Sequence, residues 1–113
     1  MTQEFMNARL AAFGSGNVDA LVAQYGDDAV VITPAGTLRG RGQIRGMIEG
    51  IIAEFAQPGV KFEMVHQAAE GPVANFVWTA ETARKVYHLG TETYLLSGGK
   101  VAYQTFAAKT TAK

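Results

Sequence analysis

The stretch YGDDAVVITPAGTLRGRGQIRGMIEGIIAEF, residues 25–55, decides the fold because it predicts a strand, a tight turn and a helix in succession. The strand is expected over Ala29–Thr33 and the turn over Pro34–Thr37. The apolar residues of the helix recur at helical spacing and are Ile44, Met47, Ile48, Ile51 and Phe55. Such a stripe must be buried by a second layer, so the stretch predicts a helix packed on a sheet.

The rest of the chain supplies the other elements of that arrangement. Before the stretch, apolar spacing predicts two amphipathic helices, over residues 3–13 and over Val18–Tyr25. After it, Pro58 ends the third helix and the apolar period changes to two. Four strands are expected, over Val60–Ala68, Val73–Thr82, Lys85–Ser97 and Lys100–Ala108.

Short turns between these strands require antiparallel neighbours. The expected fold class is α+β, with a cone-shaped, curved antiparallel sheet wrapped around three N-terminal helices in a single domain over residues 1–113. Only the tail Thr110–Lys113 is expected to be frayed.

Composition excludes several classes of function. The 113 residues are 48% hydrophobic, ten Lys and Arg residues balance ten Asp and Glu residues, and cysteine is absent. Zero net charge gives no general attraction for nucleic acid or an anionic membrane, and no run approaches the roughly 18 apolar residues of a membrane helix. The two histidines lack a neighbouring acid at metal-ligand spacing. We expect no metal, no cofactor, no nucleic-acid or membrane partner, and a cytoplasmic location.

Three separated segments resemble the nuclear transport factor 2-like superfamily, in its SnoaL-like and ketosteroid isomerase-like branch. They are GNVDALVAQYGDDAVVITPAG (Gly16–Gly36), the glycine-flanked helix entry at Gly40–Gly42, and GTETYLLSGGKVAYQTF (Gly90–Phe106). The resemblance implies a cone-shaped fold with a pocket. The superfamily includes isomerases, dehydratases, cyclases, hydrolases and proteins that only bind or dimerise, so the fold alone does not define an activity.

The resemblance to the isomerases is partial at their functional positions. Their general-base aspartate falls at Thr33, their first-helix tyrosine at Arg9, and their protonated aspartate at Glu92. A threonine hydroxyl cannot act as the base near pH 7, and an arginine donates as a permanent cation. Steroid isomerisation by that route is therefore not expected.

Alternation along the strands sorts side chains into an inward and an outward face. Glu92 is the candidate proton donor or base, with His66 or His88 as its complement, although a bulge at Gly90 would turn the first half of that strand. The candidate ligand-binding residues are Arg9, Thr33, Phe62, Met64, Phe76, Trp78, Tyr94, Gln104 and Phe106. This apolar lining with few polar groups suits a small, largely apolar molecule.

Three functions are compatible with these residues. The first is a cofactor-free isomerase, lyase or cyclase that uses general acid–base chemistry on a small carbonyl or hydroxyl compound. The second is a non-catalytic ligand-binding or dimerisation module, in which Glu92 is an ion-pair partner of Arg9. The third is a structural protein assembled by its sheet. A histidine within one small ligand of Glu92 inside a closed cavity would favour the first.

The outward face of the predicted strands is apolar for a surface in contact with water. Val77, Thr79, Val101 and Tyr103 are expected to point outward. This pattern predicts a homodimer formed through the sheet face under any of the three functions.

Overall fold

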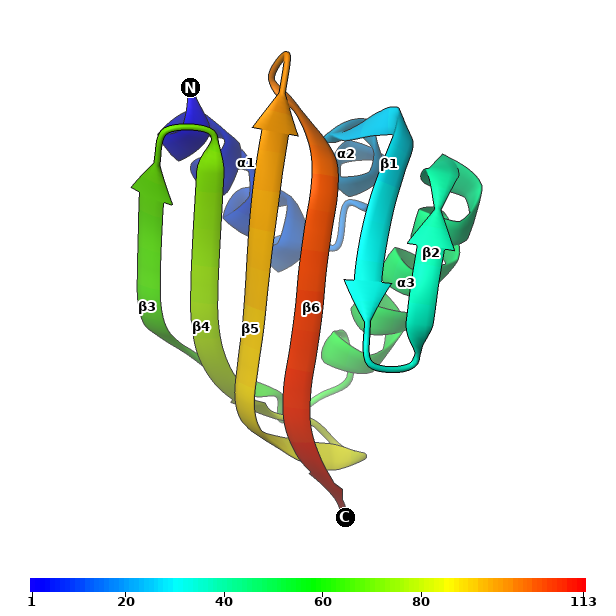
Figure 1. Ribbon diagram of the computed structural model, residues 1–113. Coiled ribbons are helices and arrows are strands. Elements are labelled where there is room, and N and C mark those ends of the chain that lie inside the picture. Colours follow the sequence, from blue (N-terminus) through cyan, green and yellow to red (C-terminus); the bar gives the residue numbers. More distant parts are fainter.

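The computed structural model describes all residues, 1–113, as three helices and one six-stranded sheet (Figure 1). The helices are α1 (Thr2–Gly14), α2 (Val18–Ala23) and α3 (Gly40–Phe55). The strands are β1 (Tyr25–Thr33), β2 (Gly36–Arg39), β3 (Lys61–Glu70), β4 (Val73–Glu81), β5 (Lys85–Ser97) and β6 (Lys100–Ala112). None of the helices combines the length and the apolar character that crossing a membrane would require.

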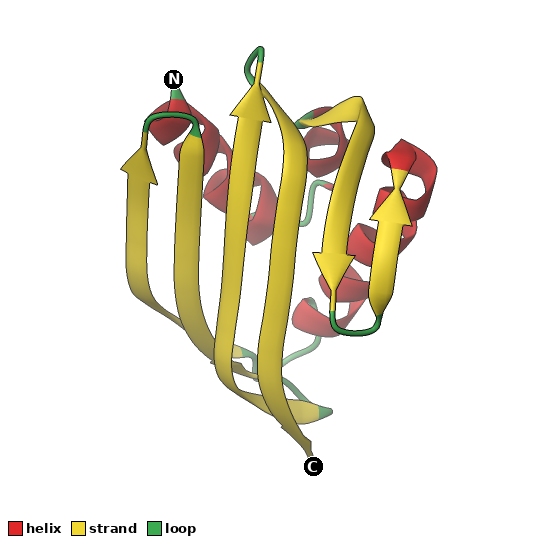
Figure 2. Cartoon of the chain, in the orientation of Figure 1, coloured by secondary structure: helices red, strands yellow, loops and turns green.

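The sheet has the strand order β2-β1-β6-β5-β4-β3, and all three helices lie on one of its faces (Figure 2). It curves without closing, so the helices occupy its concave side and the other face is uncovered. The α+β class and the curved sheet are confirmed. One pair departs from the antiparallel expectation, because β1 runs parallel to β6.

The core lies between the two layers and takes residues from every helix. Its buried apolar side chains include Phe5 and Met6 of α1, Leu21 of α2, and Ile44 and Ile48 of α3. In α3 the buried Ile44 and Ile48 belong to the apolar stripe seen in the sequence. In α1 the buried residues are Phe5, Met6 and Arg9, whereas Leu10, which belongs to the apolar stripe of that helix, is 36% exposed.

The second helix is shorter than expected, because it ends at Ala23 and Tyr25 begins β1. The backbone N–H of Val101 donates to the carbonyl of Gln24 at 2.8 Å, and Arg41 donates twice to the carbonyl of Tyr25, at 2.9 and 2.7 Å. Because of these contacts, β1 begins at Tyr25 instead of at Ala29, about one helical turn earlier in the sequence than expected. As a result the Tyr25 side chain is fully buried under the helices.

Two further expectations about the sheet are wrong. Val101 is fully buried, because the pairs Leu95–Tyr103 and Leu96–Val101 leave Ala102 as an extra residue that turns Val101 inward. The C-terminal tail is not frayed, since β6 continues to Ala112 in register with β5.

Glu54 connects the end of α3 by hydrogen bonds to the β4–β5 turn and to the start of β5. Its carboxylate accepts hydrogen bonds from the Thr82 hydroxyl at 2.8 Å and from the Tyr87 hydroxyl at 2.9 and 3.0 Å. Both donors are buried. We expect Glu54→Ala to lower the free energy of unfolding by about 2 kcal/mol, because two buried hydroxyls lose this partner.

Chemical denaturation measures that loss, and Glu49→Ala is the matched control on the solvent side of the same helix. The control should change stability by less than about 0.5 kcal/mol. Equal effects of the two substitutions would show that the Glu54 contacts contribute nothing particular to stability.

Candidate functional site

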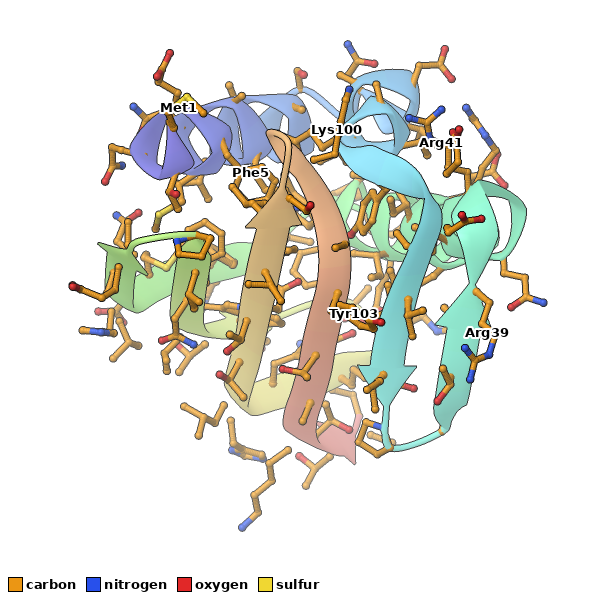
Figure 3. The ribbon with its side chains drawn as sticks, turned by 45° about the horizontal axis from the view of Figure 1, so that its top comes forward. Met1, Phe5, Arg39, Arg41, Lys100 and Tyr103 are labelled. Atoms are coloured by element: carbon orange, nitrogen blue, oxygen red, sulfur yellow. The ribbon has the colours of Figure 1, made fainter.

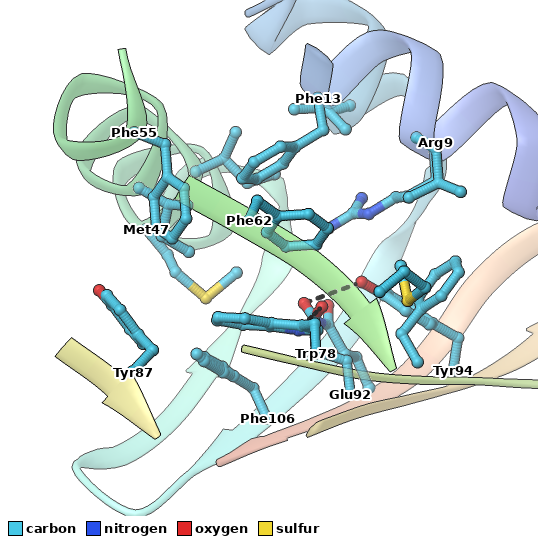
Figure 4. Close-up of a pocket in the computed structure, with 17 residues that line it drawn as sticks. Arg9, Phe13, Met47, Phe55, Phe62, Trp78, Tyr87, Glu92, Tyr94 and Phe106 are labelled. Carbon is cyan, nitrogen blue, oxygen red and sulfur yellow. Dashed lines mark hydrogen bonds between the residues drawn. The ribbon is translucent and has the colours of Figure 1, made fainter. Parts of the chain in front are cut away.

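An apolar cavity lies between the helices and the concave face of the sheet (Figure 4). Its volume is about 70 Å³. It is lined by Arg9, Leu10, Phe13, Leu21, Met47, Ile48, Ile51, Phe55, Phe62, Met64, Phe76, Trp78, Tyr87, Glu92, Tyr94, Gln104 and Phe106. Arg9 is the only basic side chain among these residues, and Glu92 is the only acidic one.

Glu92 presents its carboxylate to this cavity from the middle of β5. Oε2 accepts from the indole Nε1–H of Trp78 at 3.1 Å, and Oε1 accepts from the Tyr94 hydroxyl at 3.0 Å and from Nε2 of Gln104 at 3.3 Å. A carboxylate offers about four lone-pair positions, so three donors leave it able to accept one more hydrogen bond. That acceptor is available to a ligand.

Arg9 enters the same cavity from α1. Its Nη2 donates to the Tyr25 hydroxyl at 2.9 Å and its Nη1 donates to Oε1 of Gln24 at 3.3 Å. The guanidinium lies over two rings, with Cζ 5.2 Å from the Tyr25 centroid and 5.0 Å from that of Tyr94. Since a guanidinium has five N–H groups, further donors remain for a ligand.

The guanidinium stays charged despite its burial. Burial alone would lower the pKa of Arg9, but the neighbouring Tyr94, Tyr25 and Glu92 outweigh burial and raise that pKa above its ordinary value. Burial likewise raises the pKa of Tyr25 and of Tyr94. Both phenols are therefore neutral donors near pH 7.

Arg9 and Glu92 form no direct ion pair, but a chain of hydrogen bonds connects them. The Tyr25 hydroxyl, which accepts from Arg9, donates to Oε1 of Gln104, and Nε2 of Gln104 donates to Glu92. Every bond in the chain points from the cation toward the anion, so each polarises the next. The chain also fixes the orientation of the Gln104 amide, since its oxygen faces a donor and its nitrogen faces a carboxylate.

The structure brings together most of the side chains expected at the pocket. Those that line the cavity are Arg9, Phe62, Met64, Phe76, Trp78, Glu92, Tyr94, Gln104 and Phe106. Alternation within β4 and the second half of β5 places four of them correctly, because no bulge interrupts the pairs Phe76–Glu92 and Ala74–Tyr94.

The inward orientation expected for His66 and His88 is wrong, and in both cases a β-bulge is the cause. The pairs Met64–Trp78 and His66–Val77 leave an extra residue in β3, which turns His66 outward. In β5 the extra residue is His88 itself, whose Nε2 lies 2.9 Å from the Thr111 hydroxyl at the surface. No histidine therefore faces Glu92.

Thr33 is also outside the cavity. Its hydroxyl donates to the carbonyl of Gly36 at 2.8 Å and accepts from the N–H of Ala35 at 3.2 Å, within the turn between β1 and β2. The residue closes this hairpin and is not available to a ligand in the cavity.

Sequence reasoning missed two tyrosines of the site. Tyr25 was assigned to a helix, although it lies directly before the Gly26–Asp28 break and so could have been assigned to the following strand. Tyr87 lines the cavity because the bulge at His88 reverses the parity of the first half of β5. Alternation alone does not locate this bulge, and Gly90 indicates only that a bulge could lie in this part of the strand.

The curved sheet and the three helices thus enclose an apolar cavity with a polar cluster around Glu92. A family model, the SnoaL-like domain, matches residues 6–104 of the chain, which shows that this chain belongs to the SnoaL-like domain family. A search of curated protein sequences found no match.

Solved structures with the same fold include three informative ones, all of low sequence identity. An NTF2-like protein of unknown function from Cytophaga hutchinsonii is 14% identical, with a TM-score of 0.78 over 96% of this chain and 90% of that one. The epoxide hydrolase/cyclase-like enzyme SalBIII, which has a role in pyran ring formation in salinomycin, is 16% identical, with a TM-score of 0.79 over 98% and 95%. An LEH-like epoxide hydrolase of M. tuberculosis is 15% identical, with a TM-score of 0.67 over 92% and 79%.

Proposed function

We propose that this protein binds a small, largely apolar carbonyl or hydroxyl compound, whose oxygen is held between Arg9 and Glu92. The observation that carries the proposal is that one cation and one carboxylate line the same apolar cavity, each with hydrogen-bonding capacity left over. Arg9 would donate to a ligand oxygen and Glu92 would accept from a hydroxyl or from an acidic C–H group.

The balance of charge favours a neutral ligand. Arg9 contributes one positive charge and Glu92 one negative charge to the same cavity. An anionic ligand would place its charge near the Glu92 carboxylate, and a cationic one near the Arg9 guanidinium, in surroundings of low dielectric. A neutral molecule with one hydrogen-bond donor and one acceptor avoids both of these unfavourable charge interactions.

The proposal is tested by measuring the binding of three molecules of similar size: 1-hydroxy-2-butanone, butyrate and butylammonium. The fluorescence of Trp78, the only tryptophan of the chain, reports occupancy because the indole lines the cavity. We expect the neutral hydroxyketone to bind at least about tenfold more tightly than either ion, a difference of about 1.4 kcal/mol.

Glu92→Gln sharpens this experiment because it leaves the Arg9 cation unbalanced. Butyrate should then bind more tightly than it does to the wild type. Tighter binding of butyrate than of the hydroxyketone to the wild type, or no binding of any of the three, would contradict the proposal.

Catalysis is the second candidate function. The three side chains that donate to Glu92 are neutral, so no cation pairs directly with its carboxylate, and this favours a role of Glu92 in proton transfer. Glu92 would remove a proton from the carbon beside a ligand carbonyl. The electron pair of the broken C–H bond would then move toward the carbonyl oxygen, where Arg9 stabilises the charge. Return of the proton from Glu92 to another atom of the ligand gives an isomerase, and departure of a β-hydroxyl as water, with the proton that Glu92 has taken, gives a lyase.

Exchange of the α-protons of 1-hydroxy-2-butanone in D₂O separates this candidate from binding alone. We expect exchange catalysed by the wild type to fall by at least about a hundredfold in Glu92→Gln. The control is Glu49→Gln, on the exposed side of α3, which should retain the wild-type rate. Binding without catalysed exchange would identify a non-catalytic module. The position of Thr33 outside the cavity supports the expectation that steroid isomerisation by the family route does not occur.

We further propose a homodimer formed through the uncovered face of the sheet. Tyr103, Leu95 and Ile32 are exposed there, and Figure 3 labels Tyr103 on that face. Sedimentation at micromolar concentration should give twice the mass of the chain, because these apolar side chains would be buried between two copies. Tyr103→Glu should give the monomer, whereas Ala11→Glu on α1 should not. A monomeric wild type would refute this interface.

A further inference from the structure

A second apolar space adjoins the cavity. Leu10, Phe13, Phe55 and Phe62, which line the cavity, also line an open groove between the ends of α1 and α3 and the start of β3. The groove has a volume of about 390 Å³, against about 70 Å³ for the cavity. The two spaces are therefore adjacent and share these four side chains, and we call the smaller space the inner part and the larger one the outer part.

The inner and outer parts differ in chemistry. Arg9, Glu92 and Gln104 line only the inner part. The outer part has no charged side chain, and the residues that it adds to the four shared ones are Gly14, Ser15, Gly16, Ile52, Ala56 and Val60. A molecule that spans both parts must therefore be polar at one end and apolar at the other.

The boundary between the two parts, here called the neck, is lined by the aromatic rings of Phe13, Phe55 and Phe62. The ring centroids of Phe13 and Phe55 are 5.5 Å apart, and those of Phe62 and Trp78 are 5.6 Å apart. Phe62 is 46% exposed and Leu10 is 36% exposed, which is unusual for side chains that line a cavity. In Figure 4 the rings of Phe13 and Phe55 lie on the opposite side of the pocket from Glu92.

We infer that the ligand of this site is a neutral molecule with a small oxygenated head between Arg9 and Glu92 and an unbranched apolar tail that passes the neck and lies in the outer groove. The inference rests on the proposed function for the position of the head. The tail follows from the small inner volume and from the larger apolar groove that adjoins it. An alkyl chain suits these apolar surroundings because each methylene removed from water contributes to binding.

A chain-length series tests the tail. The affinities of 1-hydroxy-2-butanone, 1-hydroxy-2-hexanone, 1-hydroxy-2-octanone and 1-hydroxy-2-decanone are measured through the fluorescence of Trp78. We expect affinity to rise by about fourfold for each added methylene until the groove is filled, and then to level off. An affinity that is independent of chain length while the butanone still binds would overturn the tail and leave the proposed function standing.

A matched pair of variants places the tail in the groove. Ala56 lines the groove but not the inner cavity, and Ala53, three residues earlier in α3, is exposed outside both. Ala56→Arg should reduce the affinity for the decanone by at least about tenfold, equivalent to 1.4 kcal/mol, and leave that for the butanone unchanged. Ala53→Arg should change neither.

Two other results would contradict the position of the tail or of the head. Equal behaviour of Ala56→Arg and Ala53→Arg toward the decanone would show that the tail lies elsewhere and would overturn the inference. Loss of butanone binding in the wild type would instead refute the position of the head, and with it the proposed function.

Discussion

Gly90→Ala is expected to lower the free energy of unfolding by about 3 kcal/mol and to separate Trp78 from Glu92. A Cβ atom at position 90 would lie 2.4–2.7 Å from three atoms of the Trp78 ring, well inside contact distance. The ring cannot move away cheaply, since Phe62, Tyr87 and other rings pack against it. Any shift would also break the bond from the indole N–H to the Glu92 carboxylate.

Chemical denaturation measures the loss of stability, and Gly46→Ala in α3 is the control. A Cβ there meets no atom within 4 Å, so the helix should gain about 1 kcal/mol from the better helix former. If Gly90→Ala were as stable as the wild type, with an unchanged Trp78 environment, the packing described for the base of the cavity would be wrong.

Above pH 10, the free energy of unfolding is expected to fall by about 4 kcal/mol per pH unit. Burial raises the pKa of Tyr25 and of Tyr94 in the folded chain, and burial together with the Glu54 carboxylate raises the pKa of Tyr87, while all three phenols ionise near pH 10 when the chain is unfolded. The stability that these neutral phenols contribute is fully present below pH 10. It is lost as the pH rises toward the folded values, because the unfolded chain releases three protons that the folded chain keeps.

Urea denaturation at a series of alkaline pH values gives this slope. Tyr94→Phe should reduce it by about 1.4 kcal/mol per pH unit, since one of the three linked protons is removed. The same slope in wild type and variant would mean that Tyr94 ionises equally easily in the folded and unfolded chain, and that its burial among Arg9, Phe5 and Phe76 is wrong.

Periodicity predicted the three helices and the five longer strands, but not β2 (Gly36–Arg39), which has only four residues and lies partly in the expected turn. It failed where tertiary contacts override local spacing. Tyr25 continues the apolar spacing of α2, yet its backbone pairs with β6 and accepts from Arg41. The parallel pairing of β1 with β6 joins the two ends of the sequence, and no local pattern encodes it.

The site was predictable where the strands are regular. Glu92, Trp78 and Gln104 were placed inward by alternation and do line the cavity. His66 and His88 were misplaced because each lies at or just after an extra residue, which reverses the face of the side chains. The hydrogen-bond chain through Tyr25 could not be predicted, because it joins residues from α1, β1, β5 and β6.

We propose that a small neutral molecule enters the cavity and contacts the polar cluster around Glu92. The most direct test follows the indole N–H signal of Trp78 by ¹H–¹⁵N NMR, because the chain has one tryptophan and its N–H donates to Glu92. During titration with 1-hydroxy-2-butanone, that signal should move and reach saturation. An indole signal that stays in place, while other signals of the protein shift and saturate, would show that the ligand binds elsewhere and would contradict the account.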